Sequence, residues 1–523
     1  MPREVIGFLH GLDENSPGLN DSLVALLRPQ NWRLYKFVTY DFVRPFDAEI
    51  TYGLSNHYAW SQGGFPEAKP WLDWEGYEDY IADELHSIRV YFPNRPPEFY
   101  DIWSEPDHPY YWTGTYEQLL ELFYRAHNVV KAHNPQAKLV GPSVAKYVHG
   151  SGGVSDIVAF VADLDSLYGI RLDALSWHEN ESGNYGGDRP EHIIGHVQQI
   201  RSDLAARFPP DYEPELHVNE HVGNQVHLSP GYNVGYLYYL IEAEIDAAMR
   251  ACWHVYTGWP AHPTYWSDCW NGLDGMFMPD DCETPQPPFW VYKAYADMMD
   301  GDQLSIETSS ATTPALASRH DSTETLRVLV GRYYHAGACQ VIIEVEGYPY
   351  DHENVTIRFG RIPHYPEFFE IPYPKAIPLP GGPVDAWETT RDVVGGSFAV
   401  PIGIFEDNDA WVLEILETET SDIASEPASR PVLRLAPNYP NPFNPGTTIG
   451  YDLPPPAGRV RLSIYDARGR LVRTLVDRAS EPGPHEVCWD GSDDAGRRVS
   501  SGVYFCRLTW NGGSETQRMV LLR

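Results

Sequence analysis

A glutamate at the end of an apolar stretch is the residue whose type and setting best suit chemistry. The segment 99–107 reads FYDIWSEPD, so a strand-like run leads into Glu105, and Pro106 stops the strand directly after it. A carboxyl group beside the indole of Trp103 can have a raised pKa through desolvation, which a general acid needs. Taken alone, the segment fits a surface glutamate that caps a loop or the following helix equally well.

The segment 215–223, ELHVNEHVG, offers further carboxylates. Its alternation of apolar and polar residues, between a proline and a glycine, predicts a strand that begins at Glu215 and ends at Glu220. A carboxylate at each of two strand ends can supply the acid and the nucleophile of a two-step displacement.

The same segment contains the pattern His217-x-x-Glu220-His221, which zinc enzymes use. That pattern works on a helix, where positions 217 and 221 share a face, whereas the residues here favour a strand. No third ligand follows at a suitable spacing. We therefore interpret the pattern as a chance match, and expect neither a metal nor a cofactor.

Strand-like and helix-like segments alternate over about the first 300 residues. Eight strands alternating with helices predict an α/β fold, a (β/α)₈ TIM barrel, whose active-site rim is formed by the C-terminal strand ends. Glu105 and Glu220 would then lie on the rim after strands four and seven, with Glu215 at the opposite, stability face. The strands are expected at 5–9, 33–37, 50–53, 99–102, 138–140, 174–177, 216–218 and 251–253.

The connections between these strands differ in length. Apolar residues at helical spacing predict a helix over 116–132, with Thr115 and Gln118 as its capping box. By contrast, only twelve residues, 38–49, separate the second and third strands, and they include Pro45. A full crossover helix hardly fits there, so either this unit is abbreviated or the strand positions are shifted.

The periodicity changes after about residue 300. Short strands separated by Gly, Pro, Asp and Asn predict a β-sandwich; they are expected at 325–333, 339–347, 355–362, 397–404 and 410–416. The predicted domains are a catalytic barrel (1–300), a β-sandwich accessory domain (301–420), a linker (421–431) and a C-terminal β-domain (432–523). The last of these has 12 Arg, no Lys and 9 acidic residues, hence a charge of +3 against −38 for the rest.

Composition narrows the classes of partner. A formal net charge of −35 repels phosphate backbones and disfavours a nucleic-acid partner. The sequence contains no run of 18 or more apolar residues, so we expect no transmembrane segment. The N-terminus has no pattern typical of a signal peptide. The six cysteines fit buried free thiols as well as one or two local disulfides such as Cys269–Cys282.

Several motifs, in this order, resemble glycoside hydrolase clan A and within it family 39. They are WSEPD at 103–107, YWTGT at 111–115 before a helix, and NPQAKLVGP at 134–142. The resemblance spans about residues 70–300. It implies retaining hydrolysis of glycosidic bonds in plant or algal oligo- or polysaccharides, with Glu105 as acid/base and Glu220 as nucleophile.

The resemblance also implies residues that contact the sugar. The family usually has Asn where this chain has Ser104, and a tyrosine where it has Asn180. His178 and Trp253 match positions that often contact substrate in the clan, although each tryptophan fits simple packing as well. The expected substrate-binding residues are Trp103, Ser104, His178, Tyr185, Trp253, Trp259 and Trp266.

The C-terminal segment resembles the immunoglobulin-like domains related to the flagellar hook-capping protein and to type IX secretion sorting domains. The residues that carry the likeness are PNYPNPFNP at 437–445, IYDARGR at 464–470, WDG at 489–491 and SGVY at 501–504. This implies bacterial export through a secretion machinery, and thus a secreted or surface-attached protein. A non-catalytic carbohydrate-binding barrel of a surface adhesin is the alternative to an enzyme.

Overall fold

The structure is a computed structural model of the chain. It describes residues 5–9, 21–35, 40–64, 67–180, 189–223, 226–251, 273, 275–278, 283–334, 339–365, 377–418, 434–435, 438, 443–453, 458–466, 470–480, 483–510 and 513–521. The chain divides into two compact units, Met1–Thr418 and Glu419–Arg523, and each is described by itself.

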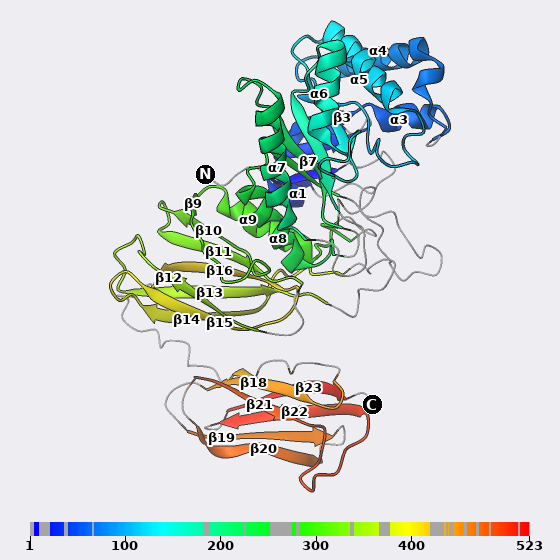
Figure 1. Cartoon of the computed structure of the whole chain (residues 1–523). Helices are drawn as coiled ribbons and strands as arrows, with labels where there is room; N and C mark the ends of the chain where they lie inside the picture. Colours follow the sequence, from blue (N-terminus) through cyan, green and yellow to red (C-terminus); the bar gives the residue numbers. More distant parts are fainter. Residues whose placement is uncertain are drawn as a thin grey trace. The chain divides into compact units, whose positions relative to one another are not determined.

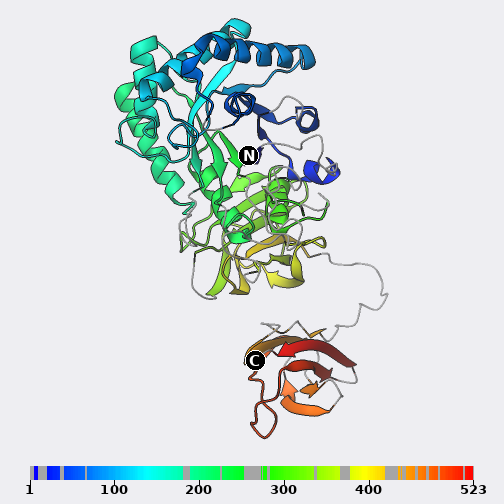
Figure 2. The ribbon, with the colours of Figure 1, turned by 90° about the vertical axis from the view of Figure 1, so that its right-hand side faces the viewer.

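Eight parallel strands close into a barrel in the first unit, which confirms the predicted fold class (Figures 1 and 2). Most of the strand residues are buried, because neighbouring side chains fill the inside of the barrel and helices cover its outside. The strands are β1 (Gly7–Leu9), β2 (Asn31–Leu34), β3 (Glu49–Gly53), β4 (Phe99–Asp101), β5 (Lys138–Val144), β6 (Ala174–Glu179), β7 (Glu215–His221) and β8 (Ala247–Arg250).

Helices connect these strands. The capping box of Thr115 and Gln118 is present at the start of α5. Between β2 and β3 the described residues hold only α2 and the short η2, and β2 also begins earlier than expected. Both alternatives that the spacing left open, an abbreviated unit and a shifted strand, therefore apply. None of the described helices combines the length and apolar character needed to span a membrane. The helices are α1 (Asp21–Leu27), α2 (Tyr40–Val43), η2 (Arg44–Phe46), α3 (Ser55–Ser61), η3 (Pro70–Leu72), α4 (Trp74–Tyr91), α5 (Tyr116–His133), α6 (Ile157–Tyr168), α7 (His192–Arg207), α8 (Pro230–Glu242) and α9 (Pro287–Met298).

Two strands lie earlier in the chain than the sequence pattern placed them. β2 begins at Asn31 instead of residue 33, and β8 spans Ala247–Arg250 instead of 251–253. β8 ends in a fully buried arginine, which donates a hydrogen bond of 3.1 Å to Asn233 Oδ1. The expected eighth strand began just after this arginine; charged residues are almost never fully buried unless paired. The expected second strand, by contrast, began at Arg33 and left out Asn31 and Trp32.

Two antiparallel sheets complete the first unit. One has six strands in the order β14-β13-β16-β11-β10-β9, the other pairs β12 with β15, and apolar side chains from both form one core. The sequence missed β9, β10 and β14. The bounds are β9 (Asp302–Leu304), β10 (Ala315–His320), β11 (Thr325–Gly331), β12 (Cys339–Val345), β13 (Asn354–Ile362), β14 (Val384–Asp392), β15 (Phe398–Phe405) and β16 (Ala410–Glu417).

The six-stranded sheet packs directly on the barrel's α8 and α9 (Figure 1). The backbone nitrogen of Gly231 in α8 donates to the carbonyl of Asn408 at 2.7 Å, just before β16. A Cβ atom at Gly231 would lie 1.9 Å from the carbonyl oxygen of Arg332, so a side chain cannot fit there. Tyr333, after β11, donates a hydrogen bond of 2.6 Å to Glu191 at the start of α7.

The second unit is a small β-domain with its own core around the fully buried Trp489. Its strands form a three-stranded sheet, β17-β18-β21, and a four-stranded sheet, β20-β19-β22-β23. The bounds are β17 (Arg434–Leu435), β18 (Thr447–Leu453), β19 (Gly458–Asp466), β20 (Leu471–Ser480), β21 (Gly483–Trp489), β22 (Gly502–Trp510) and β23 (Gly513–Leu521).

Three of the six cysteines, Cys339, Cys488 and Cys506, are free thiols. The pair Cys269–Cys282, considered above for a local disulfide, lies outside the described residues.

Candidate active site

Glu105 lies four residues beyond the end of β4, on the C-terminal side of the barrel. Its backbone has a φ of 51°, the left-handed region that non-glycine residues adopt uncommonly. Its amide nitrogen donates to the carbonyl of Ser143 in β5 at 2.8 Å, which fixes this turn. The side chain is 19% exposed, so the carboxylate is largely buried but reachable. Strained backbone of this kind is frequent at functional sites.

Glu220 lies near the end of β7, and both of its carboxylate oxygens accept hydrogen bonds. Arg33 Nη1 on β2 donates to Oε1 at 3.2 Å, and Asn180 Nδ2 just after β6 donates to Oε2 at 3.1 Å. The register of β7 shifts against β6 and against β8 near this residue. Such irregularities re-aim side chains at barrel rims, and here the carboxylate is 16% exposed.

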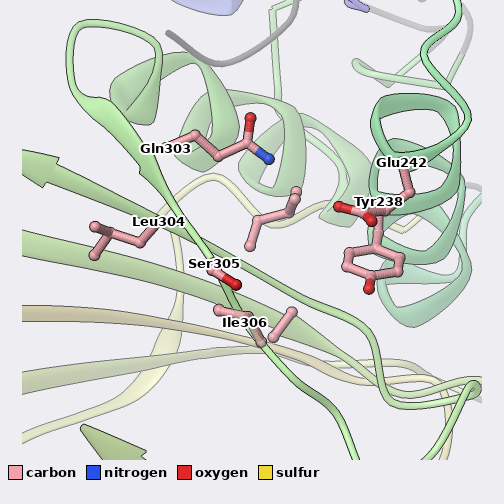
Figure 3. A pocket seen from close by; sticks show the side chains of 8 residues that line it. Tyr238, Glu242, Gln303, Leu304, Ser305 and Ile306 are labelled. Atoms are coloured by element: carbon pink, nitrogen blue, oxygen red, sulfur yellow. The ribbon is translucent and has the colours of Figure 1, made fainter. Parts of the chain in front are cut away.

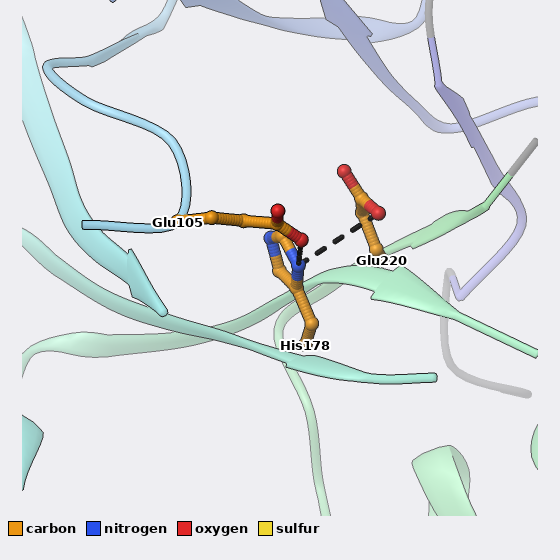
Figure 4. A group of neighbouring side chains, drawn as sticks. All are labelled: Glu105, His178 and Glu220. Atoms are coloured by element: carbon orange, nitrogen blue, oxygen red, sulfur yellow. Dashed lines mark hydrogen bonds and ion pairs between the residues drawn. The ribbon is translucent and has the colours of Figure 1, made fainter. Parts of the chain in front are cut away.

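His178 links the two glutamates (Figure 4). Its Nδ1 atom lies 3.1 Å from Oε1 of Glu105 and 3.7 Å from Oε2 of Glu220. One oxygen of each carboxylate lies within 4.8 Å of the other. The imidazole is fully buried, whereas the two carboxylates are partly exposed to solvent. Side chains from β6, β7 and the loop after β4 thus converge at one point of the rim.

The charges of these groups depend on one another. Burial raises the pKa of Glu105, but the hydrogen bond and charge of His178, together with the charge of Arg33, outweigh burial and hold it below its usual range. The pKa of Glu220 is raised overall. Burial and the negative charge of Glu105 raise it, and they outweigh the positive charges of His178 and Arg33, which lower it. Burial lowers the pKa of His178, yet the charge of Glu220 and the hydrogen bond with Glu105 raise it overall.

The pKa of Glu105 is lowered, whereas the sequence had predicted a raised pKa from desolvation beside Trp103. That expectation counted only desolvation and omitted the imidazole, which the sequence places 73 residues away. The two directions, a lowered pKa for Glu105 and a raised pKa for His178, favour an ionised carboxylate beside a protonated imidazole.

A buried polar network supports the site from below. Arg33 donates from Nε to Oδ2 of Asp101 at 2.9 Å and from Nη2 to Oγ of Ser104 at 3.1 Å. Asp101 in turn accepts from Ser143 Oγ at 2.9 Å, and Asn219 Nδ2 donates to the same hydroxyl oxygen at 2.9 Å. Because the Arg33 and Asp101 side chains are at most 1% exposed, the guanidinium is fixed in place against Glu220.

Arg33, Asp101 and Asn180 were not among the residues expected to form the site. A signal for Arg33 and Asp101 was present, because each is a charged residue inside an otherwise apolar strand segment, and charged residues are almost never buried without a partner. Asn180 had been noted only as a departure from the family pattern. Its side chain in fact contacts Glu220.

Two tyrosines also border the carboxylates. Burial raises the pKa of Tyr111, and the negative charges of Glu105 and Glu220 raise it further, so its phenol stays protonated. Burial likewise raises the pKa of Tyr35, whose ring lies 5.1 Å from the guanidinium carbon of Arg33. Neither tyrosine was among the expected site residues.

The other expected residues divide into two groups. Trp103 is fully buried, its indole nitrogen donates to the carbonyl of Tyr111 at 3.2 Å, and its ring packs against Tyr58 and Trp112 in the core. Ser104 is also buried and bonds Arg33. The remaining expected residues, Tyr185, Trp253, Trp259 and Trp266, lie outside the described residues.

The zinc pattern at 217–221 is on a strand, as expected. His217 Nε2 lies 3.1 Å from Oε2 of Glu215, and His221 Nε2 lies 3.2 Å from the hydroxyl of Tyr292. Glu220 groups instead with Glu105 and His178. The guanidinium of Arg33 places a positive charge 3.2 Å from Glu220, which disfavours a cation between these carboxylates.

Glu215 lies at the other end of β7, as predicted. It forms an ion pair of 2.6 Å with Lys138 at the start of β5. Burial raises its pKa, but the hydrogen bonds from His217 and Lys138 outweigh burial and lower the pKa to about 2. Its role is therefore structural.

A separate hollow of about 420 Å³ opens between the end of α8 and strands β9 and β10 (Figure 3). Its polar lining includes Tyr238, Glu242, Gln303 and Ser305. It includes none of the residues that surround Glu105 and Glu220.

Part of the second unit matches a known family. Residues 441–514 match the FlgD Ig-like domain. Over 70 residues, the chain is 39% identical to the basal-body rod modification protein FlgD of Salmonella typhimurium, which covers 13% of this chain and 30% of that protein. The chain thus spans less than a third of the length of this relative.

Solved structures resemble a larger part of the chain. N2152 from Neocallimastix frontalis is 16% identical with a TM-score of 0.62, over 80% of this chain and 97% of that one. A glucosidase from Croceicoccus marinus is 14% identical with a TM-score of 0.56, over 80% and 98%. The GH39 enzyme from Xanthomonas axonopodis pv. citri is 14% identical with a TM-score of 0.51, over 80% and 94%. At these identities, the likeness is one of fold, that of a barrel followed by antiparallel sheets.

Proposed function

We propose that the first unit is a retaining glycoside hydrolase that acts on oligo- or polysaccharides. The observation that carries this proposal is the pair Glu105 and Glu220, which stand on the loop after β4 and on β7 with one oxygen of each within 4.8 Å of the other. Carboxyl groups about 5–5.5 Å apart suit direct attack on the sugar, whereas inverting enzymes need a wider gap of roughly 6.5–9.5 Å to hold a water. The fold shared with a glucosidase and a GH39 enzyme supports the same reaction class.

In this mechanism Glu220 attacks the anomeric carbon while Glu105 protonates the departing glycosidic oxygen. The bond between that carbon and the oxygen breaks, and a covalent glycosyl-Glu220 intermediate forms. Glu105 then takes a proton from water, which attacks the same carbon and releases Glu220. Arg33 and Asn180 hold the two oxygens of Glu220, so that one fixed orientation faces the sugar.

The proton that Glu105 must deliver is supplied within the site. In the free protein His178 carries it at Nδ1, 3.1 Å from Oε1 of Glu105. A bound sugar would exclude water from the partly exposed carboxylate and raise the pKa of Glu105, which favours proton transfer along this hydrogen bond. His178 therefore acts as a proton store and as the residue that positions Glu105.

Turnover of a panel of aryl glycosides tests the activity, with glucosides and xylosides first. Wild-type protein should release the aryl alcohol, and Glu220→Gln at the same concentration should not. If saccharides bind but no glycoside is turned over by the wild type, the barrel is a carbohydrate-binding protein and the proposal is wrong.

For the second unit we propose a role in export or in attachment to the cell surface. Its FlgD-like segment and its separate hydrophobic core support a module that works independently of the barrel. Fusing residues 419–523 to a reporter in a bacterium that produces this protein, and following the reporter to the cell surface, tests this role.

A further inference from the structure

A second group of metal-ligating side chains lies in the six-stranded sheet, apart from the barrel's carboxylates. Glu324 ends the turn between β10 and β11, His352 precedes β13, and Glu417 is the last residue of β16. One ligand atom from each of the three lies within 4.8 Å of the others. They meet because β16 runs antiparallel to both β11 and β13, so that its last residue lies beside the first residues of those strands.

The imidazole of His352 is fixed in position before any ligand arrives. Its side chain is 4% exposed, and its Nδ1 atom lies 2.9 Å from the hydroxyl of Tyr348. The ring also packs near Tyr348 and Tyr350, with centroids 5.8 and 5.6 Å away. A partner on the second ring nitrogen is the arrangement by which proteins orient a metal-binding histidine.

The other ring nitrogen faces two carboxylates. Nε2 of His352 lies 2.9 Å from Oε2 of Glu324 and 4.0 Å from Oε2 of Glu417. With its Nδ1 hydrogen donated to the hydroxyl of Tyr348, the imidazole would present the lone pair of Nε2 to a cation, and the two carboxylates would supply oxygen ligands beside it. The two glutamates are 57% and 66% exposed, so small movements can bring their oxygens to a shared ion.

We propose that Glu324, His352 and Glu417 bind one Zn²⁺ ion. One nitrogen and two carboxylate oxygens form a ligand set that suits zinc, whereas Ca²⁺ and Mg²⁺ prefer oxygen ligands alone. Zinc bonds of about 2.0–2.2 Å in tetrahedral geometry would place the ligand atoms roughly 3.3–3.6 Å apart, between the two distances observed. Water completes the coordination. The ion would join three segments that are far apart in sequence, and this site is independent of the glycosidase proposal.

The binding test uses the full-length chain stripped of metal with a chelator. Because Glu105, His178 and Glu220 form another such group, every protein carries Glu105→Gln. Titration calorimetry with ZnCl₂ should show one site, and Zn²⁺ should raise the Tm in a way that excess chelator reverses. CaCl₂ should produce neither effect.

Variants locate the ion. Glu324→Gln and Glu417→Gln should each weaken Zn²⁺ binding about tenfold or more, and Tyr348→Phe should weaken it roughly tenfold through the orientation of the imidazole. Glu353→Gln is the matched control, because it removes the same charge from the exposed neighbour of His352 and should leave binding unchanged. Absence of Zn²⁺ binding, or equal affinity in Glu353→Gln and the double variant Glu324→Gln/Glu417→Gln, would overturn the proposal.

Discussion

The Nδ2 atom of Asn180 lies 3.1 Å from Oε2 of Glu220 and donates a hydrogen bond to it. The opposite oxygen, Oε1, accepts from Arg33. A carboxylate held at both oxygens has one fixed orientation, and both bonds favour its ionised form. Asn180 therefore contributes to the position and to the charge of Glu220 without itself reacting.

Replacement of Asn180 by Ala should raise the pKa of Glu220, because a donor to its ionised form is lost. The acidic limb of the kcat/KM profile should then move to higher pH, and kcat should fall about tenfold, the effect of one hydrogen bond to a charged group. Asn180→Asp should move the limb further, since it adds a like charge. An unchanged acidic limb in both variants would show that Asn180 does not act on Glu220.

The two glutamates should differ in their response to the leaving group. Glu220→Gln should lower kcat by about 10²-fold or more for every substrate, because the nucleophile is needed in each case. Glu105→Gln should lower kcat by a similar factor for substrates with poor leaving groups. The loss should be much smaller for a dinitrophenyl glycoside, because dinitrophenolate departs without being protonated. Equal losses for both substrate classes in Glu105→Gln would contradict its role as the acid. Melting curves should show both variants folded.

The first sugar released should have the anomeric configuration of the substrate. Attack by Glu220 and then by water gives two inversions, hence net retention. Proton NMR during the first minutes of the reaction, before mutarotation, distinguishes the two anomers. A product of inverted configuration would exclude the covalent intermediate, even if both glutamates proved essential.

Stability should depend on pH through His178. Its pKa in the folded protein is raised above the ordinary value of 6.5, because the charge of Glu220 and the hydrogen bond with Glu105 outweigh its burial. A raised pKa contributes stability that is full below 6.5 and is lost as the pH rises through the folded-state pKa. The Tm difference between wild type and His178→Gln, measured from about pH 5 to 9, should therefore shrink with increasing pH. A difference that grows would contradict this charge assignment.

A protein that ends at Thr418 should keep kcat/KM within about twofold of the full chain. Every described contact of Glu105 and Glu220 lies in the first unit, and the second unit has its own core. Kinetics on soluble aryl glycosides, with the two proteins at equal concentration, test this expectation. If turnover falls while binding is preserved, the second unit contributes to catalysis.

The fold could be predicted largely because the barrel strands are short apolar runs between amphipathic helices. β3 and β4 each lay within one residue of their expected bounds. Apart from the missed β9, β10 and β14, the strands displaced along the chain were β2 and β8, each of which contains a buried arginine, Arg33 or Arg250. The expected second strand already began at Arg33 and left out Asn31 and Trp32, whereas the expected eighth strand began just after Arg250. Only the tertiary structure shows the partners that allow these arginines to be buried.

The site could be predicted in part, because a carboxylate next to a strand end needs no knowledge of distant residues. Glu105 and Glu220 were chosen in this way, and the structure brings their carboxylates together. Their protonation could not be, since it depends on His178 and Arg33, which approach from other strands. The left-handed backbone conformation of Glu105 could not be predicted either, because its amide donates to the carbonyl of Ser143, which lies on the next strand.

The close approach at Gly231 has a consequence for how the chain can be divided. The backbone of α8 meets that of Asn408 and Arg332 with no space for a side chain, so the barrel and its sheets share one interface of main-chain atoms. Removing the sheets would leave the N-terminal turn of α8 without this partner and would expose apolar residues of α9 to water. We therefore expect the barrel and the sheets to unfold as one cooperative unit, so that the smallest part of the first unit able to fold by itself extends to Thr418, well beyond the barrel.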